Sequence, residues 1–217
     1  IEQSKKAGYD SFPIVSVVAL FIGFIFALQS AYFMQRIGSE MYIASLVALA
    51  IVRELGPVIT ALVVAGRVGA SHTAELGSMQ VTEQIDALET LAANPVKYLV
   101  VPRFVALSIM LPILTLYANI IGIVGSYLIC VLKMGITSSM YMNITFSALA
   151  YKDLFTGLFK SWIFGMIIAL VSCYEGFNVE GGAEGVGKAT TRSVVITFLM
   201  IIAADCFFTA LFYFIFP

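Results

Sequence analysis

Five long apolar stretches take up most of the sequence and restrict the fold more than any other feature. They lie near residues 12–35, 42–66, 99–132, 154–174 and 193–216. A helix of about 20 apolar residues crosses the hydrocarbon core of a bilayer, and each stretch reaches that length. In the whole chain 60% of the 217 residues are hydrophobic and 12% are charged, which is too apolar for a water-soluble domain. We therefore predict an all-α integral membrane protein, with five transmembrane helices in a single domain over residues 1–217.

The third stretch is the longest and holds two prolines. It runs from residue 99 to 132, which exceeds one straight span, and it contains Pro102 and Pro112. A proline inside a helix removes a backbone hydrogen bond and kinks or breaks the helix. We therefore expect an interfacial start, a tilt or a kink in this stretch.

Lysine and arginine residues fall unequally on the two sides of the predicted spans. One side receives seven, Lys5, Lys6, Arg67, Lys97, Arg103, Lys188 and Arg192, and the other receives three, Arg36, Lys133 and Lys152. Because cytoplasmic loops carry the excess, the N-terminus and the connections 67–98 and 175–192 are predicted to be cytoplasmic and the C-terminus external. The external connections, 34–41 and 133–153, are too short to form a domain, so any external binding domain must belong to another protein.

Several ionisable residues inside or next to the predicted spans are candidates for intramembrane charges. Arg53 and Glu54 are adjacent in the second span, Lys160 and Asp205 lie in the fourth and fifth, and Glu175 directly follows the fourth. Each such charge costs about 2.5–3.5 kcal/mol at the centre of a bilayer, so it needs a partner or a water-lined cavity. We interpret Arg53 and Glu54 as part of a transport pathway. We expect Asp205 to pair with Lys160 or Arg53, with a role in gating as the alternative.

The connection 67–98 contains a predicted amphipathic helix. Val81, Ile85, Leu88 and Ala92 recur at helical spacing, and Glu83, Asp86 and Glu89 lie on another face. Thr82 is a candidate N-cap and Asn94-Pro95 a stop signal, so the helix should run from Thr82 to about Ala93. Helices that bind anionic lipid are usually rich in Lys and Arg, whereas this one is acidic. It is therefore expected to dock in a groove of a protein.

The sequence supplies no complete catalytic, metal or nucleotide site. Residues 182–188 match the start of the phosphate-binding pattern G-x-x-x-x-G-K-[ST], but Ala189 replaces the hydroxyl residue that would hold magnesium, and no strand is predicted before it. His72 does not come with the three or four ligands of a zinc site, and we expect it to be solvated or interfacial. The net charge of -1 provides no basic excess for nucleic acid. We therefore predict no enzymatic activity and no cofactor in this chain.

Several of these segments together resemble one protein family. The block RELGPVITALVVAGRVGASHTAELGSMQVTEQIDALE (53–89), followed by ANP and PRF and later by GVGKATTRSVV, is similar to the MlaE (YrbE) family of ABC-transporter permeases. The similarity extends from about Phe12 to Phe216. It implies a permease subunit without an ATPase site of its own, in a complex that hydrolyses ATP.

The resemblance also implies partners, a membrane and a cargo. Two permease copies would form a homodimer on a dimer of cytoplasmic ATPase subunits, which bind ATP and Mg. MCE-domain subunits would stand on the periplasmic side, and a small STAS-type protein would be a further accessory. The complex would lie in the bacterial inner membrane, or in the inner envelope of a plastid, and move glycerophospholipids between membranes to maintain outer-membrane lipid asymmetry. Family members carry a further N-terminal amphipathic helix, which we expect to have been lost before Ile1.

On the same resemblance, two groups of residues acquire roles. Arg53 and Glu54 match the family's charged pair near the lipid cavity. The end of the first span, with Phe26, Gln29, Phe33 and Ile37, would line an outward-facing and mainly apolar pocket for acyl chains. The acidic helix would be the coupling helix that docks on the ATPase, with contacts from Thr82, Glu83, Asp86, Leu88 and Glu89.

Two other functions stay open on the residues alone. An ion-coupled secondary carrier or channel would use Glu54, Lys160 and Asp205 as a titrating path and would work without an ATPase. An intramembrane lipid enzyme would need a nucleophile, a base and an orienting group within reach of one another, and the sequence does not indicate such a set. The direction of transport and the head-group and acyl selectivity do not follow from the sequence, since apolar walls distinguish lipids poorly.

Overall fold

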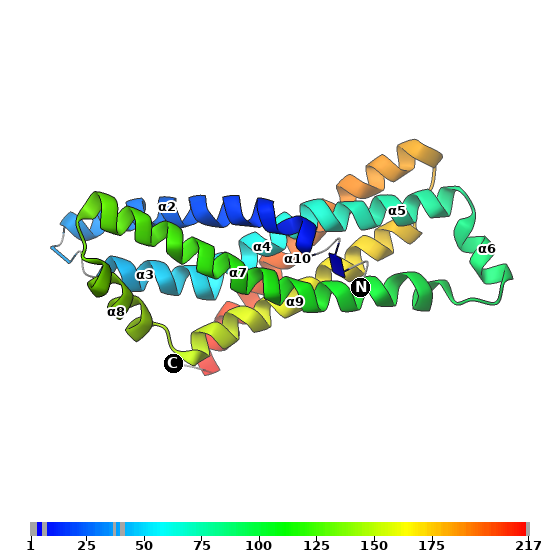
Figure 1. Ribbon diagram of the computed structural model, residues 1–217. Coiled ribbons are helices and arrows are strands. Elements are labelled where there is room, and N and C mark those ends of the chain that lie inside the picture. Colours follow the sequence, from blue (N-terminus) through cyan, green and yellow to red (C-terminus); the bar gives the residue numbers. More distant parts are fainter. Residues whose placement is uncertain (1–3, 6–7, 37, 40–41, 216–217) are drawn as a thin grey trace. The chain divides into compact units, whose positions relative to one another are not determined.

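The computed structural model describes residues 4–5, 8–36, 38–39 and 42–215, and almost all of them are helical (Figure 1). Five segments in this range are long and apolar enough to cross a membrane: Tyr9–Arg36, Ile43–Val81, Val96–Met134, Tyr151–Phe177 and Gly182–Ile215. The same described residues contain no strand. The prediction of an all-α membrane protein with five spans is confirmed, while its orientation in the membrane stays a prediction.

The five segments are built from shorter helical elements. The first consists of η1 (Tyr9–Ser11) and α2 (Phe12–Arg36). The second joins α3 (Ile43–Ala50), the π-helical turn η3 (Ile51–Leu55), α4 (Gly56–Val64), the π-helical turn η4 (Ala65–Gly69) and α5 (Ala70–Val81). After the short helix α6 (Gln84–Thr90), the third joins the π-helical turn η5 (Val96–Val100) to α7 (Val101–Met134). Helix α8 (Ser138–Ala148) precedes the fourth segment, α9 (Tyr151–Phe177), and the fifth is α10 (Gly182–Ile215).

Helix α7 contains both prolines of the third span. Pro102 directly follows the π-helical turn η5, in which the N–H of Val101 bonds to the carbonyl oxygen of Val96, five residues back, so the proline lies at a widened turn of the helix. Pro112 lies inside the helix, which continues past it to Met134. The third span therefore begins at Val96, earlier than expected, and neither proline ends it.

The chain divides into two compact units. Unit 1 comprises Ile1–Ser11, Ala61–Pro112 and Ser161–Pro217, and unit 2 comprises Phe12–Thr60 and Ile113–Lys160. Helices α7 and α9 contribute residues to both units. Each unit combines segments that are distant in the sequence, so the fold depends on long-range packing.

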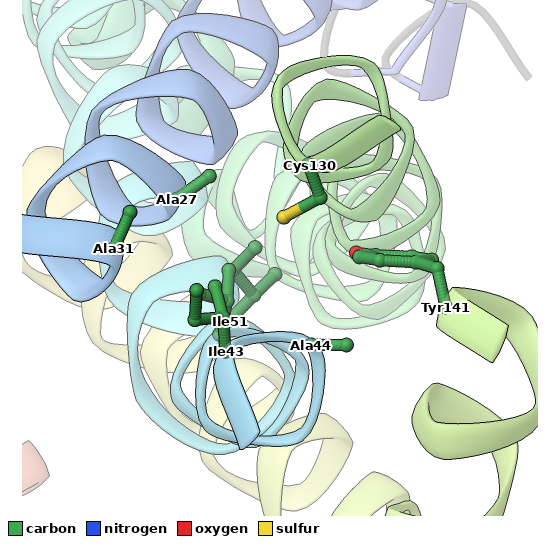
Figure 2. Close-up of a cluster of buried hydrophobic side chains, with 8 residues drawn as sticks. Ala27, Ala31, Ile43, Ala44, Ile51, Cys130 and Tyr141 are labelled. Atoms are coloured by element: carbon green, nitrogen blue, oxygen red, sulfur yellow. The ribbon is translucent and has the colours of Figure 1, made fainter. Parts of the chain in front are cut away.

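Unit 2 has an apolar core between α2, α3, η3, α7 and α8. Its buried residues are Ala27, Ala31, Ile43, Ala44, Val47, Ile51, Cys130 and Tyr141. Figure 2 shows these side chains gathered around a common centre. A Cβ on Gly23 would lie 2.1 Å from the carbonyl oxygen of Gly122, so α2 approaches α7 closely because residue 23 has no side chain.

Unit 1 contains a buried apolar cluster and a buried polar contact. The buried residues of this cluster are Leu76, Ile85, Leu99 and Cys173. Helix α5 packs along α10, and the buried hydroxyl of Thr73 lies 3.0 Å from the carbonyl oxygen of Ser172 and 2.9 Å from the hydroxyl of Ser193. Hydrogen bonds of this kind join membrane helices where apolar side chains alone give little specificity.

Candidate functional site

An ion pair joins the second and fourth helical segments inside unit 2. The ammonium Nζ of Lys160 in α9 donates a hydrogen bond to Oε2 of Glu54 in η3, at 2.5 Å. The Lys160 side chain is 2% exposed, whereas that of Glu54 is 37% exposed. A buried cation needs a counter-charge because it has lost its hydration. Glu54 therefore neutralises a buried positive charge while staying partly open to its surroundings.

A second ion pair lies one residue away. Nη1 of Arg53 is 3.7 Å from Oδ1 of Asp153 in the first turn of α9. The other oxygen of this carboxylate accepts a hydrogen bond from the N–H of Ala150 at 3.0 Å, so Asp153 also caps the start of α9. The Asp153 side chain is 6% exposed and that of Arg53 is 39% exposed. In both pairs, one partner is buried and the other is accessible.

The accessible partners, Arg53 and Glu54, lie in the π-helical turn η3. In a regular α-helix, the ring of Pro57 would collide with the carbonyl group of Arg53, four residues earlier. The N–H of Gly56 instead bonds to the carbonyl oxygen of Ile51, five residues back, as in a π-helix. The wider turn accommodates the proline, and such turns are frequent at functional sites.

Two glycines let neighbouring helices reach this turn. A Cβ on Gly157 would lie 2.2 Å from the carbonyl oxygen of Val52, so glycine at this position permits α9 to approach η3. Lys160 follows on α9 about one turn later. A Cβ on Gly56 would lie 1.8 Å from Oδ1 of Asn119 in α7. The ion pairs thus depend on close contacts between helices, and a side chain at residue 56 or 157 would prevent these contacts.

The two pairs place accessible charges of both signs within a membrane span. Arg53 comes ten residues after Ile43, the start of its segment, which corresponds to about 15 Å along the helix. Charges at such a depth need water or a polar ligand. The guanidinium of Arg53 can bind a phosphate through parallel N–H donors, and the carboxylate of Glu54 can accept hydrogen bonds from an amine. The arrangement therefore suits a ligand that carries both kinds of group.

The residues predicted to line an apolar pocket lie in or just after α2. Phe26 is partly buried and packs against the core of unit 2, which includes Ile51 of η3. Gln29 is exposed, and Phe33 is 53% exposed with its ring edge-on to that of a neighbouring tyrosine. Ile37 lies outside the described residues. Phe26 thus packs on the core of unit 2, and the pocket itself stays a prediction.

Two of the intramembrane cations have carboxylate partners that sequence reasoning did not name. Lys160 pairs with Glu54 and Arg53 with Asp153, while the expected pairing of Asp205 with Lys160 or Arg53 stays a prediction. Asp205 is a partly buried residue of α10. Sequence reasoning missed Asp153 because it lies at the edge of a predicted external connection, where a charge needs no partner. Its place at the start of an apolar span was the signal that could have identified it.

Helix α6 lies between the second and third segments, as expected for the proposed coupling helix, but it is shorter than predicted. It spans Gln84–Thr90 rather than Thr82 to Ala93. Left-handed backbone conformations bound it on both sides, with φ of 58° at Glu83 and 57° at Ala92. Non-glycine residues rarely adopt this conformation, so neither boundary could be read from the residue types.

Two predicted end signals of this helix act on its neighbours instead. The hydroxyl of Thr82 donates a hydrogen bond to the carbonyl oxygen of Ser78 at 2.8 Å, so Thr82 ends α5 and does not cap α6. The side-chain oxygen of Asn94 accepts a hydrogen bond from the N–H of Lys97 at 3.2 Å and caps the start of the third segment. Side chains of Thr, Ser and Asn can hydrogen-bond backbone groups at either end of a helix. The residue types alone therefore did not show which helix Thr82 and Asn94 stabilise.

The candidate ATPase contacts on α6 fall into an anchoring set and an exposed set. Ile85 is buried, and Leu88 is partly buried against the core of unit 1. Asp86 and Glu89 are exposed and line one surface hollow, and Glu83 is exposed at the start of the helix. The helix therefore attaches to unit 1 by its apolar face and presents three carboxylates outward.

Two arginines that we counted as cytoplasmic charges form ion pairs within unit 1. Nη2 of Arg103 lies 3.1 Å from Oε2 of Glu75, and the Arg103 side chain is 5% exposed. Arg192 lies 2.5 Å from a carboxylate oxygen of Glu175, whose side chain is 4% exposed. Sequence reasoning found neither pair, because the partners are 28 and 17 residues apart.

The structure also places the glycine-rich stretch 182–188 and His72. Residues 182–188 form the first turns of α10, so this glycine-rich stretch is not a phosphate-binding loop. His72 is 2% exposed, so it is not solvated, and the other alternative, an interfacial position, stays a prediction. It lines a pocket with Asp10, Arg67 and Glu75, in which Arg67 and Asp10 form an ion pair at 3.9 Å.

Comparison with known proteins gives a consistent result over the whole chain. The family described as "Permease MlaE" matches residues 1–211. A probable ABC transporter permease protein of Rickettsia prowazekii is 45% identical over 213 residues, which cover 98% of this chain and 82% of that protein. A probable ABC transporter permease protein of Synechocystis is 41% identical over 207 residues, 95% of this chain and 79% of that protein. The chloroplastic protein TRIGALACTOSYLDIACYLGLYCEROL 1 of Arabidopsis thaliana is 38% identical over 213 residues, 98% of this chain and 61% of that protein.

Proposed function

The chain belongs to the MlaE permease family of ABC transporters, and we propose that its cargo is a glycerophospholipid carried between membranes to maintain outer-membrane lipid asymmetry. The observation that carries this proposal is the pair of accessible charges, Arg53 and Glu54, within an apolar span. A phospholipid combines a charged head group with apolar acyl chains, and unit 2 offers both a polar turn and the apolar side chain of Phe26, which packs on the same core as Ile51 of η3. The name of the Arabidopsis relative, which is that of a galactolipid, supports a lipid cargo.

The energy for this transport would come from a separate cytoplasmic ATPase. A permease of an ABC transporter implies such a partner, and ATP and Mg would bind there rather than to this chain. We assign α6 as the coupling helix, because its exposed carboxylates at Glu83, Asp86 and Glu89 suit a groove lined by basic residues. Leu88 and Thr82 would hold the helix at the correct place on unit 1.

The remaining partners follow from the family alone. The permease would act as a homodimer, with MCE-domain subunits on the periplasmic side and a small STAS-type accessory protein. The short connections between the described spans support the assignment of the external domain to another protein. The complex would lie in the bacterial inner membrane, with the predicted N-terminus inside and C-terminus outside.

In the proposed cycle, the lipid head group binds at η3 and the acyl chains lie against α2. Phosphate oxygens would bind the accessible guanidinium of Arg53, which Asp153 holds in place. ATP binding would close the ATPase dimer, move α6, and change the affinity of the site for lipid. ATP can bias the cycle only if the two conformations bind lipid differently.

The test of the cargo is lipid transfer by the reconstituted transporter. The permease and its ATPase are placed in liposomes with a fluorescent phospholipid, and transfer to MCE-bearing acceptor vesicles is measured. ATP-dependent transfer that persists when proton and sodium gradients are removed supports the proposal. Transfer that follows an ion gradient and continues without the ATPase would favour the carrier alternative.

The test of the coupling helix is a charge reversal with a matched control. Asp86→Lys with Glu89→Lys should separate ATP hydrolysis from transport or prevent assembly with the ATPase. The control makes the same change of charge at two exposed residues elsewhere, Glu180→Lys just before α10 with Glu184→Lys in its first turn. Unchanged assembly and transport in the first variant would refute the docking assignment.

A further inference from the structure

Helix α8 is an uncharged helix between two membrane spans. It spans Ser138–Ala148, and its eleven residues have a length of about 16 Å, too short for a hydrocarbon core of about 30 Å. Three residues connect it to the end of α7 and two connect it to the start of α9. These connections reach at most about 10 Å, so α8 cannot move far from the ends of the two spans. It therefore lies at the membrane surface on the side where the third span ends and the fourth begins.

One face of α8 is fixed to unit 2. Tyr141 is fully buried in the core shown in Figure 2, and its hydroxyl donates a hydrogen bond to Oγ of Ser126 at 3.0 Å. The ring of Tyr141 packs edge-on against that of Tyr127, with centroids 5.4 Å apart, and Thr145 is buried on the same face. This attachment fixes the rotation of α8 about its axis, so the outward residues are determined.

The outward surface of α8 has an apolar edge and a polar edge. Met142 is 44% exposed and Phe146 is 72% exposed, and residues four apart lie about 40° from each other around a helix. Asn143 and Ser147 are exposed on the adjoining sector. The other exposed apolar residue of the helix, Met140, lies on the far side of this polar sector and lines a hollow near the end of α7.

The residues that flank α8 are those that anchor helices at a membrane surface. Lys133 and Lys152 are exposed, one on either side of the helix. Tyr151 is 95% exposed and Leu132 is 75% exposed. Lysines reach lipid phosphates while their stems stay in apolar surroundings, and tyrosines concentrate at the head-group level. A water-exposed surface would not favour this combination of apolar and amphipathic side chains.

We propose that α8 is an interfacial helix whose Met142–Phe146 edge inserts into the acyl-chain boundary of the leaflet on its side of the membrane. Its buried face holds unit 2, its apolar edge enters lipid, and its polar edge faces water. The partner of this surface is thus the bilayer itself and not another protein. The proposal rests on the five spans and does not depend on the cargo.

The position of α8 also bears on the charged site. The connection from α8 to α9 includes Ala150, whose N–H binds the carboxylate of Asp153. Asp153 in turn holds Arg53. A change in the depth of α8 would therefore move the start of α9 and alter the ion pair in η3.

The experiment that tests this inference measures the lipid exposure of single tryptophans. Phe146→Trp is made in a Trp162→Phe background of the full-length protein, with any tryptophan outside residues 1–217 and in the co-purified subunits also replaced, and the transporter with these subunits is reconstituted in phosphatidylcholine liposomes. Ser147→Trp, about 100° away around the helix, is the matched control. Fluorescence is quenched with lipid carrying a nitroxide near the top of the acyl chain, and separately with aqueous iodide.

We expect the nitroxide lipid to quench Phe146→Trp at least twofold more strongly than Ser147→Trp, and iodide to show the reverse order. Met142→Trp should behave like Phe146→Trp, which keeps the test valid if one variant does not fold. Strong iodide quenching at both 142 and 146 would place the edge in water and overturn the proposal. Protection from both quenchers would show a covering protein and would overturn it equally. Neither result requires lipid transport, so failure here is distinguishable from failure of the proposed cargo.

Discussion

The ion pair between Glu54 and Lys160 predicts unequal effects of removing its two partners. Glu54→Gln removes the carboxylate that lies 2.5 Å from the ammonium of Lys160, whose side chain is 2% exposed. Lys160→Met leaves a carboxylate that is 37% exposed and can be hydrated or rotate outward. Although each variant breaks the same pair, the loss of Glu54 should therefore be the more destabilising change.

The expected magnitudes follow from the burial of the residue that is left behind. Stranding a buried charge costs about 3–5 kcal/mol, and we expect about 3 kcal/mol for Glu54→Gln because the amide oxygen still accepts a hydrogen bond. Loss of a partner from an accessible charge costs about 1 kcal/mol or less. The double variant removes both charges of this pair, so its stability should lie within about 1 kcal/mol of the parent. The coupling energy of the double-mutant cycle should then be about 2–4 kcal/mol.

The measurement is thermal unfolding of the purified permease in one detergent, for the parent, both single variants and the double variant. For a chain of this size, 1 kcal/mol shifts Tm by about 2–4 °C, so Glu54→Gln should lower Tm by about 6–12 °C and Lys160→Met by about 2–4 °C. The decisive result is a Tm of the double variant that returns close to the Tm of the parent, well above that of Glu54→Gln. Equal losses from the two single variants, or additive losses in the double variant, would refute the argument from burial.

Three further predictions concern other parts of the chain. Gly56→Ala should cost about 1–3 kcal/mol, because its Cβ would lie 1.8 Å from Asn119, whereas Gly66→Ala meets no atom within 4 Å and should be tolerated in the same unfolding assay. Glu83→Gly should raise the free energy of unfolding by about 0.5–1 kcal/mol, since glycine relieves the left-handed strain at φ 58° but increases the entropy of the unfolded chain, and a loss of stability would contradict this. Burial raises the pKa of the Tyr141 hydroxyl above its ordinary value of 10.0, so its hydrogen bonds should persist through neutral pH and be lost only as pH rises through the higher folded-state pKa. Tyr141→Phe should cost about 1 kcal/mol and abolish this alkaline loss, as measured by unfolding between neutral pH and pH 11 or so.

The spans could be predicted from the sequence because a membrane helix is a local property. Length and hydropathy within one window decide whether a segment crosses the bilayer, and neighbouring spans add little to that decision. The helix ends were less predictable. The second segment continues to Val81, well past the predicted end at residue 66, since a helix can leave the membrane without a break.

The ion pairs could not be predicted because their partners are distant in the sequence. Lys160 and Glu54 are 106 residues apart, and their contact depends on the close approach of α9 to η3 at Gly157. The sequence indicated that these charges need partners, but several carboxylates satisfied that requirement equally. Only the packing of the helices selects Glu54 for Lys160 and Asp153 for Arg53.

The boundaries of α6 were wrong for a different reason. Thr82 and Asn94 are residue types that stabilise helix ends, and that part of the interpretation was sound. They serve α5 and the third segment, however, because Glu83 and Ala92 adopt left-handed conformations that no residue pattern indicates. Short connections between long helices thus contain competing end signals, and tertiary packing decides between them.

The most direct test of the proposed lipid transporter is native mass spectrometry of the complex, extracted gently from its own membrane. The experiment identifies the protein subunits and the retained lipid together. We expect two permease copies, two ATPase subunits, an MCE-domain assembly and bound phospholipid, with less lipid retained by an Arg53→Gln variant. A permease oligomer that reproducibly lacks an ATPase, or a complete assembly without phospholipid, would contradict the proposal.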